Sequence, residues 1–162
     1  IFKTNSGTEH MRINAAGIIT KPLQPAFLVR PASEQSNIAV SSAVTIVFGT
    51  EVFDQNADFA SNTFTAPVTG RYQLSANIRL NNTDSASDYY RIELNTSNRT
   101  YYQIFDPNFG QDAAFWTSTI SVLVDMDASD TAIVKITQGG GTQQTDIDAN
   151  NGYTTFSGYL VA

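Results

Sequence analysis

The segment that most restricts the fold is residues 72–80, which follows a turn at residues 66–70. Larger apolar residues alternate there with polar or small ones, from Tyr72 to Leu80. A period of two is typical of a β-strand with one buried face. Pro67 cannot donate to a sheet and Gly70 tolerates a positive φ, so the chain can reverse before this strand begins. The sequence therefore predicts a tight turn followed by a half-buried strand.

Short strand patterns of the same kind recur along most of the chain. Turn signals separate them, at residues 81–84, 95–98, 106–108, 139–141 and 150–152. No long segment has the 3.6-residue period of a helix. Many short strands at regular spacing favour a β-sandwich. The further strands are predicted at residues 27–29, 44–48, 64, 89–94, 101–105, 115–124, 132–137 and 153–161.

Composition narrows the choice of partners. The chain has 162 residues, enough for one domain with a core and a short appendage. The formal net charge of −6 and the lack of a basic stripe argue against nucleic acid as a partner.

The chain has no cysteine, so it has no disulfide or thiolate metal site. No apolar run is long enough for membrane insertion. Because the chain starts at Ile1 rather than Met, we expect it to be part of a longer protein.

The region around the turn is similar to the signature of the complement-1q globular domain, a member of the tumour-necrosis-factor-like jelly-roll superfamily. Residues 24–29 resemble the first strand of that family and residues 156–161 its last, so the resemblance covers residues 24–162. Leu74 and Ala76 stand where the family has aromatic residues. The resemblance implies an all-β jelly-roll sandwich that assembles as a homotrimer. The matching signature residues are Phe48, Asp54, Phe59, Phe64, Gly70 and Tyr72.

Residues 1–23 have shorter strand patterns than the rest of the chain and are predicted to form a short β-appendage or the end of a fibre shaft. Residues 24–162 are predicted to form the head. Their three short alternating segments cannot bury much apolar area alone. They need a partner, either the head or the same segments of neighbouring chains. Residues 7–13 with Gly17 resemble a short repeat that precedes the C-terminal head in bacteriophage tail-fibre proteins.

Adjacent aromatic pairs at residues 89–90, 101–102 and 115–116 indicate a covered surface. Successive strand residues face opposite sides of a sheet, so one ring of each pair points outward. Exposed rings in such numbers indicate a binding face or a subunit interface. We favour packing about a threefold axis over a sugar-binding surface. The candidates for the trimer interface are Tyr72, Tyr90, Tyr102 and Tyr159.

A receptor site is expected in a loop, because loops held by a rigid sandwich carry function in such folds. The loop at residues 106–114 is flanked by aromatic residues and contains amide and carboxylate groups. Rings cover the apolar faces of sugars, and polar tips bind the hydroxyl groups. The alternative is that some of these rings close one end of the core. The receptor-binding candidates are Trp116, Phe109, Asn108, Gln111 and Asp112.

Catalytic chemistry is not predicted. His10, the single histidine, lies in the appendage, where a strand residue is a simpler interpretation than a member of a catalytic triad. Carboxylates are present, but sequence spacing does not place two of them at the separation that glycoside cleavage requires. We therefore expect a protein that is not an enzyme.

A metal site is a secondary hypothesis. The aspartates of residues 125–130 alternate in a turn but lack the glycine and glutamate of a calcium loop. Some members of the resembled family bind calcium near the trimer apex. The loop at residues 139–152 does not match the family closely enough to transfer those ligands, but its two carboxylates, Asp146 and Asp148, are the candidate ligands, and no other cofactor is expected.

Together these features predict the trimeric C-terminal head of a bacteriophage tail fibre or other virion appendage. From the tip of the fibre, this head would bind a receptor on the host cell surface. We favour a glycan as the receptor, and the alternative is a protein. Two alternatives stay open: a trimerisation and capping module without a ligand, and an extracellular adhesion domain of a secreted protein of the same fold.

Overall fold

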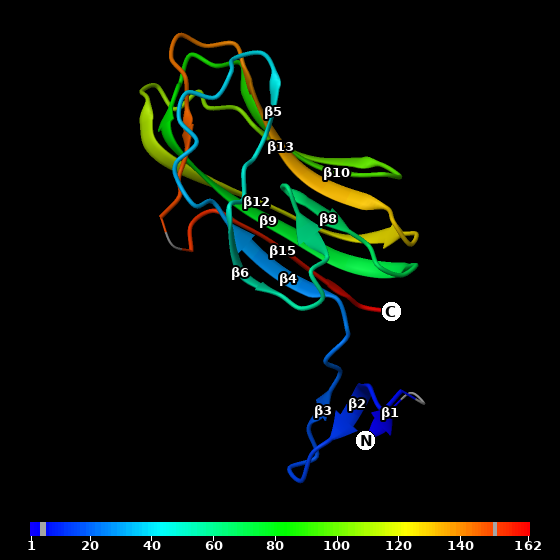
Figure 1. Ribbon diagram of the computed structural model, residues 1–162. Coiled ribbons are helices and arrows are strands. Elements are labelled where there is room, and N and C mark those ends of the chain that lie inside the picture. The colour runs from blue at the N-terminus through cyan, green and yellow to red at the C-terminus, as the bar shows by residue number, and fades with distance from the viewer. Residues whose placement is uncertain (4–5, 151) are drawn as a thin grey trace.

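The structure, a computed structural model, describes residues 1–3, 6–150 and 152–162. Its regular elements are all strands, and every strand pair is antiparallel. None of these residues belongs to a helix that could span a membrane. A small N-terminal sheet lies apart from a two-layered sandwich (Figure 1). This N-terminal sheet, the appendage, has the order β1 (Phe2–Lys3), β2 (Glu9–Ile13) and β3 (Ile19–Thr20).

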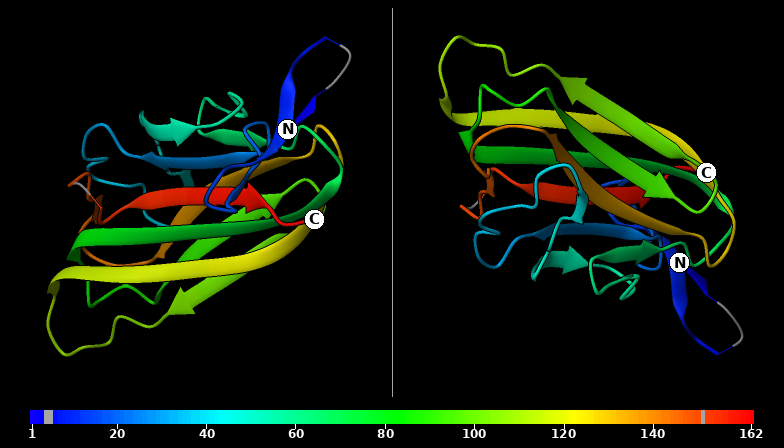
Figure 2. Two further views of the ribbon diagram at one scale, coloured as in Figure 1. Left: turned by 90° about the horizontal axis from the view of Figure 1, so that it is seen from below. Right: turned by 90° about the horizontal axis from the view of Figure 1, so that it is seen from above.

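Two sheets form the sandwich. The front sheet has the order β12-β9-β15-β4-β6, with β14 paired to β9; the back sheet has the order β11-β10-β13-β8-β7, with β5 paired to β13. In Figure 2 the front-sheet strands β12, β9, β15 and β4 lie side by side in yellow, green, red and blue. The front strands are β4 (Ala26–Arg30), β6 (Thr50–Asp54), β9 (Gly70–Thr83), β12 (Ala113–Met126), β14 (Asp146–Ile147) and β15 (Thr155–Leu160). The back strands are β5 (Ala43–Thr45), β7 (Phe59–Ala60), β8 (Thr63–Thr65), β10 (Tyr89–Thr96), β11 (Thr100–Phe105) and β13 (Thr131–Gly139).

The alternating segment at residues 72–80 is the centre of the front sheet, as the pattern predicts. It lies in β9, which pairs with β12 on one side and β15 on the other. Its even-numbered side chains point into the sandwich and are fully buried, whereas its odd-numbered side chains face outward. This alternation confirms the all-β sandwich and fixes which side of the sheet meets water.

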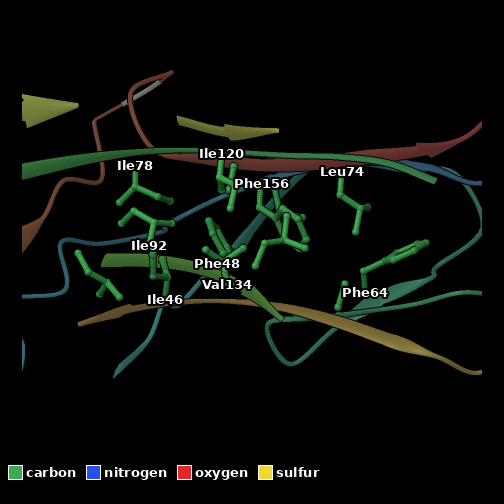
Figure 3. Packing of buried hydrophobic residues seen from close by; sticks show 14 of the residues in the cluster. Ile46, Phe48, Phe64, Leu74, Ile78, Ile92, Ile120, Val134 and Phe156 are labelled. Carbon is green, nitrogen blue, oxygen red and sulfur yellow. The ribbon is translucent and has the colours of Figure 1, made fainter. Parts of the chain in front are cut away.

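The core lies between the two sheets. Side chains of the front sheet point toward the back sheet: Ile78 lies over Ile92, and Leu74 lies over Phe64 (Figure 3). Aromatic rings fill one part of the core: the ring of Phe27 stacks on that of Phe64, with centroids 4.7 Å apart. Offset stacking adds to the free energy gained by burying the rings.

Two tyrosines predicted for the trimer interface belong to this core. Tyr72 and Tyr90 have no exposed surface, so neither can contact a neighbouring chain. The hydroxyl of Tyr72 donates to the carbonyl of Val68, 2.7 Å away, and thereby closes the predicted turn. The prediction failed because the even positions of β9 and β10 point inward, which the adjacent aromatic pairs alone do not reveal.

The loops divide between the two ends of the sandwich. Those at residues 31–42, 84–88, 106–112 and 140–145 lie at the end away from the appendage (Figure 1). At the other end, the side chains of Gln55 and Asn56 donate to carbonyls of residues 21–23 and join the sandwich to the linker. We call the end away from the appendage the distal end.

Candidate functional site

The outward side of β9, β12 and β15, here called the front face, contains exposed apolar residues. The pairing of β12 with β9 and of β9 with β15 places Leu123, Gln73 and Tyr159 in one row across the sheet. Leu123 is 54% exposed and Tyr159 is 52% exposed. The predicted interface residue Tyr159 therefore points outward, next to an exposed leucine that the sequence reasoning did not select.

An arginine clamp occupies the distal part of the front face. The guanidinium of Arg79 lies between two rings, 4.5 Å from the centroid of Phe115 and 4.1 Å from that of Tyr153. Its Nε atom is 3.2 Å from Oδ2 of Asp148, close enough for an ion pair but without hydrogen-bond geometry. The clamp holds the two rings at the surface and neutralises a carboxylate that is 1% exposed.

A second cluster, here called the aromatic stack, lies on the open side of the sandwich between β11 and β12. The ring of buried Tyr90 stacks on that of Phe105 at 5.1 Å between centroids. Phe105 contacts Trp116 at 5.3 Å, and Trp116 stacks on Phe109 at 4.8 Å. Trp116 and Phe109 are each 39% exposed, so the stack runs from the core to the surface at the distal end.

The structure gathers the predicted receptor residues in this region but gives them different roles. Asn108 and Gln111 are exposed in the same loop as Phe109. Asp112 is committed to the neighbouring loop, since its Oδ1 accepts hydrogen bonds from the N–H and the hydroxyl of Ser85. The groups free to contact a ligand are therefore the two rings and the two amides, and Asp112 holds two loops together.

Tyr102, also predicted for the interface, lies on the outer side of the back sheet. It is 57% exposed on β11, an edge strand, where Ile104 faces the same side. The guanidinium of Arg91 is 5.4 Å from the Tyr102 ring centroid and forms an ion pair with Glu93. Tyr102 and Tyr159 therefore lie on two different surfaces of one molecule.

The predicted metal ligands accept hydrogen bonds from protein groups. Asp146 accepts from the backbone N–H of Asn37 and from the side-chain amide of Asn82, and Asp148 accepts from the N–H of Asn150. No cluster of three or more histidine, cysteine, aspartate or glutamate side chains that could hold a metal occurs in residues 1–3, 6–150 and 152–162. The two carboxylates hold loops in place in this structure.

Sequence reasoning missed the role of Asp84, which organises the distal loops. The buried carboxylate accepts hydrogen bonds from the backbone N–H groups of Ala86, Thr142 and Gln143. Burial by itself raises the pKa of Asp84, but these backbone donors together hold the pKa below its ordinary value. The carboxylate therefore stays ionised and joins the loop after β9 to the loop after β13.

A buried polar network continues from this carboxylate. The N–H of Asp84 donates to the hydroxyl of Tyr90, which also shares a hydrogen bond with the hydroxyl of Thr145. The side chain of Gln138 accepts from the N–H of Thr145 and donates to Ser87. Every one of these groups is buried and hydrogen-bonded, so the network is rigid. It fixes the hydroxyl of Tyr90 and thereby holds the buried end of the aromatic stack in place.

Comparison with known proteins agrees with this architecture. No curated protein sequence matches the chain. The globular domain of zebrafish complement 1qA is 15% identical with a TM-score of 0.60, and the alignment covers 86% of this chain and 98% of that domain. The crystal structure of murine APRIL is 12% identical with a TM-score of 0.63, and the alignment covers 85% of this chain and 99% of the chain in that structure. The model of the C1q domain family matches residues 26–161, so the chain belongs to the C1q domain family.

Proposed function

We propose that this chain is the homotrimeric C-terminal head of a bacteriophage tail fibre or other virion appendage, which binds a host cell-surface glycan without catalysis. C1q and tumour-necrosis-factor-like domains form homotrimers, are typically non-enzymatic and are often extracellular. The proposal adds to these family properties the location on a virion, the receptor and its chemical class.

Self-association is supported by the exposed apolar residues, which lie on two separate surfaces. Leu123 and Tyr159 belong to the front face, and Tyr102 and Ile104 belong to the edge strand β11. A monomer rarely leaves so many large apolar side chains in water. If the front face of one chain contacts strand β11 of the next chain, the contact is heterologous. Such contacts close into a ring of three when each chain is rotated by one third of a turn relative to its neighbour.

Glycan binding is supported by one observation above all: Phe109 and Trp116 present a stacked, partly exposed pair of rings beside the amides of Asn108 and Gln111. Flat aromatic surface next to amide groups suits a sugar, whose apolar face packs on a ring while its hydroxyl groups bind the amides. The stack lies at the distal end, where a fibre tip would meet a cell. Three copies per head would raise the avidity of a weak site.

The virion context is supported by the appendage. Residues 7–13 with Gly17 are similar to a repeat found just before the heads of bacteriophage tail fibres. In the structure residues 9–13 of this segment form β2, the central strand of the appendage, which lies at the opposite end of the sandwich from the distal loops (Figure 1). A shaft that entered at the appendage would leave the distal loops free for a receptor.

A purely structural head is the second candidate, and the aromatic stack itself gives a reason for it. Phe105 connects the exposed rings to buried Tyr90, so the same rings could simply close one side of the core. In that case the head would trimerise and cap the fibre without a ligand.

Binding of variants distinguishes the two candidates. We expect the wild-type head to bind a subset of bacterial lipopolysaccharide and capsular polysaccharide chains on an array, and Phe109→Ala to weaken that binding at least tenfold. Asn108→Ala, which leaves the stack intact, should also weaken binding. Val68→Ala, an exposed position at the opposite end, serves as the control and should have no effect.

The oligomeric state is measured on the same samples by light scattering. Leu123→Asp should convert the trimer into monomers, because it places a charge in the proposed interface. A wild-type trimer that binds no surface glycan, or unchanged glycan binding by Phe109→Ala, would support the structural candidate. A wild-type monomer would overturn the trimeric head.

A further inference from the structure

The appendage is a sheet with one apolar side. Phe2 pairs with Met11, and Ile13 pairs with Ile19. Paired residues point to the same side, as do residues two apart on one strand, so these four side chains share one side. His10 and Arg12 of β2 point to the other side. Glu9, at the start of β2, belongs to the same side as Met11 and Ile13. This side therefore carries four large apolar residues and one carboxylate, whereas the other side carries His10 and Arg12.

The apolar side of the appendage lacks a cover within the described chain. Phe2 is 59% exposed, Ile13 55% and Ile19 57%. The strands β1, β2 and β3 pair only with one another among the described strands. A sheet with strands of only two, five and two residues is too small to be stable in water with its apolar side exposed. The sequence requires a partner for these residues, and the sandwich of the same chain does not supply it.

The position of Ile19 indicates what the partner is. Ile19, Ala26 and Tyr159 line one surface hollow of about 380 Å³ at the junction of appendage and sandwich. Tyr159 belongs to the front face, which is proposed to contact another copy of the chain. One residue of the apolar side, Ile19, therefore lies close to one residue of the front face, Tyr159, and a neighbouring copy seated on the front face would reach the appendage.

We propose that the appendages of three chains pack their apolar sides against one another on the threefold axis of the head. This inference rests on the proposed trimer. Phe2, Met11, Ile13 and Ile19 of each chain would form a small shared core, and His10 and Arg12 would face water. Glu9, at the start of β2, forms an ion pair with Arg12, with 2.6 Å between Nη2 and Oε2, so its charge is neutralised at the edge of this shared core.

Cysteine cross-linking of the whole chain tests the arrangement, since the natural sequence has no cysteine. In Ile13→Cys the new thiols would lie near the axis. A disulfide forms where two Cα atoms approach to about 4.4–6.8 Å, so only positions on the axis side can react efficiently. The matched control, Arg12→Cys, is one residue away on the opposite side. Copper–phenanthroline with air as oxidant removes two hydrogens per disulfide and can join two of the three chains.

We expect Ile13→Cys to form covalent dimers at least ten times faster than Arg12→Cys, at a rate independent of protein concentration. Ile19→Cys, a second position on the apolar side, should behave like Ile13→Cys. Light scattering on each sample separates the two proposals. Trimers in which Ile13→Cys and Arg12→Cys react equally would overturn this inference and leave the trimeric head intact. Monomers would overturn the trimeric head, and this inference with it.

Discussion

Replacing Asp84 by asparagine tests how the distal loops are held. The carboxylate is buried and accepts three backbone N–H groups, one on Oδ1 and two on Oδ2. An asparagine of the same shape keeps one acceptor oxygen, which can face Thr142 and Gln143. Its amide NH₂ then faces the N–H of Ala86, and this part-buried donor loses its partner.

The magnitude follows from these bonds. A buried donor without a partner costs about 1–3 kcal/mol, and each of the two remaining hydrogen bonds weakens by about 1 kcal/mol when its acceptor loses its charge. We therefore expect Asp84→Asn to lower the free energy of unfolding by about 3–5 kcal/mol. Urea denaturation followed by tryptophan fluorescence measures it, because Trp116 lies in the adjoining stack. Asp88→Asn, an exposed change in the same loop, should alter it by less than about 0.5 kcal/mol.

The dependence of stability on pH gives an independent check. Because the folded protein holds the pKa of Asp84 below the value of about 3.9 that an unfolded chain has, the unfolded state binds more protons between these two values. The contribution of Asp84 is fully present above the unfolded pKa and is lost as the pH falls through the folded pKa. Asp84→Asn should flatten this part of the profile. An unfolding free energy within 1 kcal/mol of wild type, with an unchanged acid profile, would refute the reasoning.

Two further substitutions test the front sheet. Arg79→Met should lower the free energy of unfolding by about 3 kcal/mol, because it leaves the buried carboxylate of Asp148 without its cation. Urea denaturation measures this loss. Adding Asp148→Asn should recover part of it, and a double variant that is no more stable than Arg79→Met would contradict the ion pair. Gly158→Ala should cost about 1–3 kcal/mol, since a Cβ there would lie 2.4 Å from Cδ2 of Leu74. Thermal unfolding measures this second change, with Ser157→Ala as the control, and equal melting temperatures for the two variants would show that the core has room at Gly158.

The fold could be predicted well from local patterns. The alternation in residues 72–80 identified the central strand, and Pro67 with Gly70 identified the turn before it. Both signals are local, because a strand with one buried face imposes its period on its own residues. The resemblance at Phe48, Phe64 and neighbouring signature positions added the family, which the match over residues 26–161 bears out.

The candidate site was predicted only in part. The sequence brought Phe109 and Trp116 into one hypothesis, and the structure stacks their rings. The sequence could not distinguish exposed Tyr102 from buried Tyr90, because each tyrosine is the second residue of a Tyr-Tyr pair in a predicted strand. Which member of a pair points inward depends on the register of the strand, and register is set by long-range pairing.

By itself the sequence determined the local properties of this protein: its strands, its turns and the two-sided character of the appendage. Only the tertiary structure decided which distant groups meet. Asp84 accepts from Thr142 and Gln143, and Arg79 reaches Asp148, across long stretches of chain. The physical reason is that hydrophobic periodicity acts between near neighbours along the chain, whereas hydrogen bonds and ion pairs in the loops depend on how the two sheets bring remote segments together.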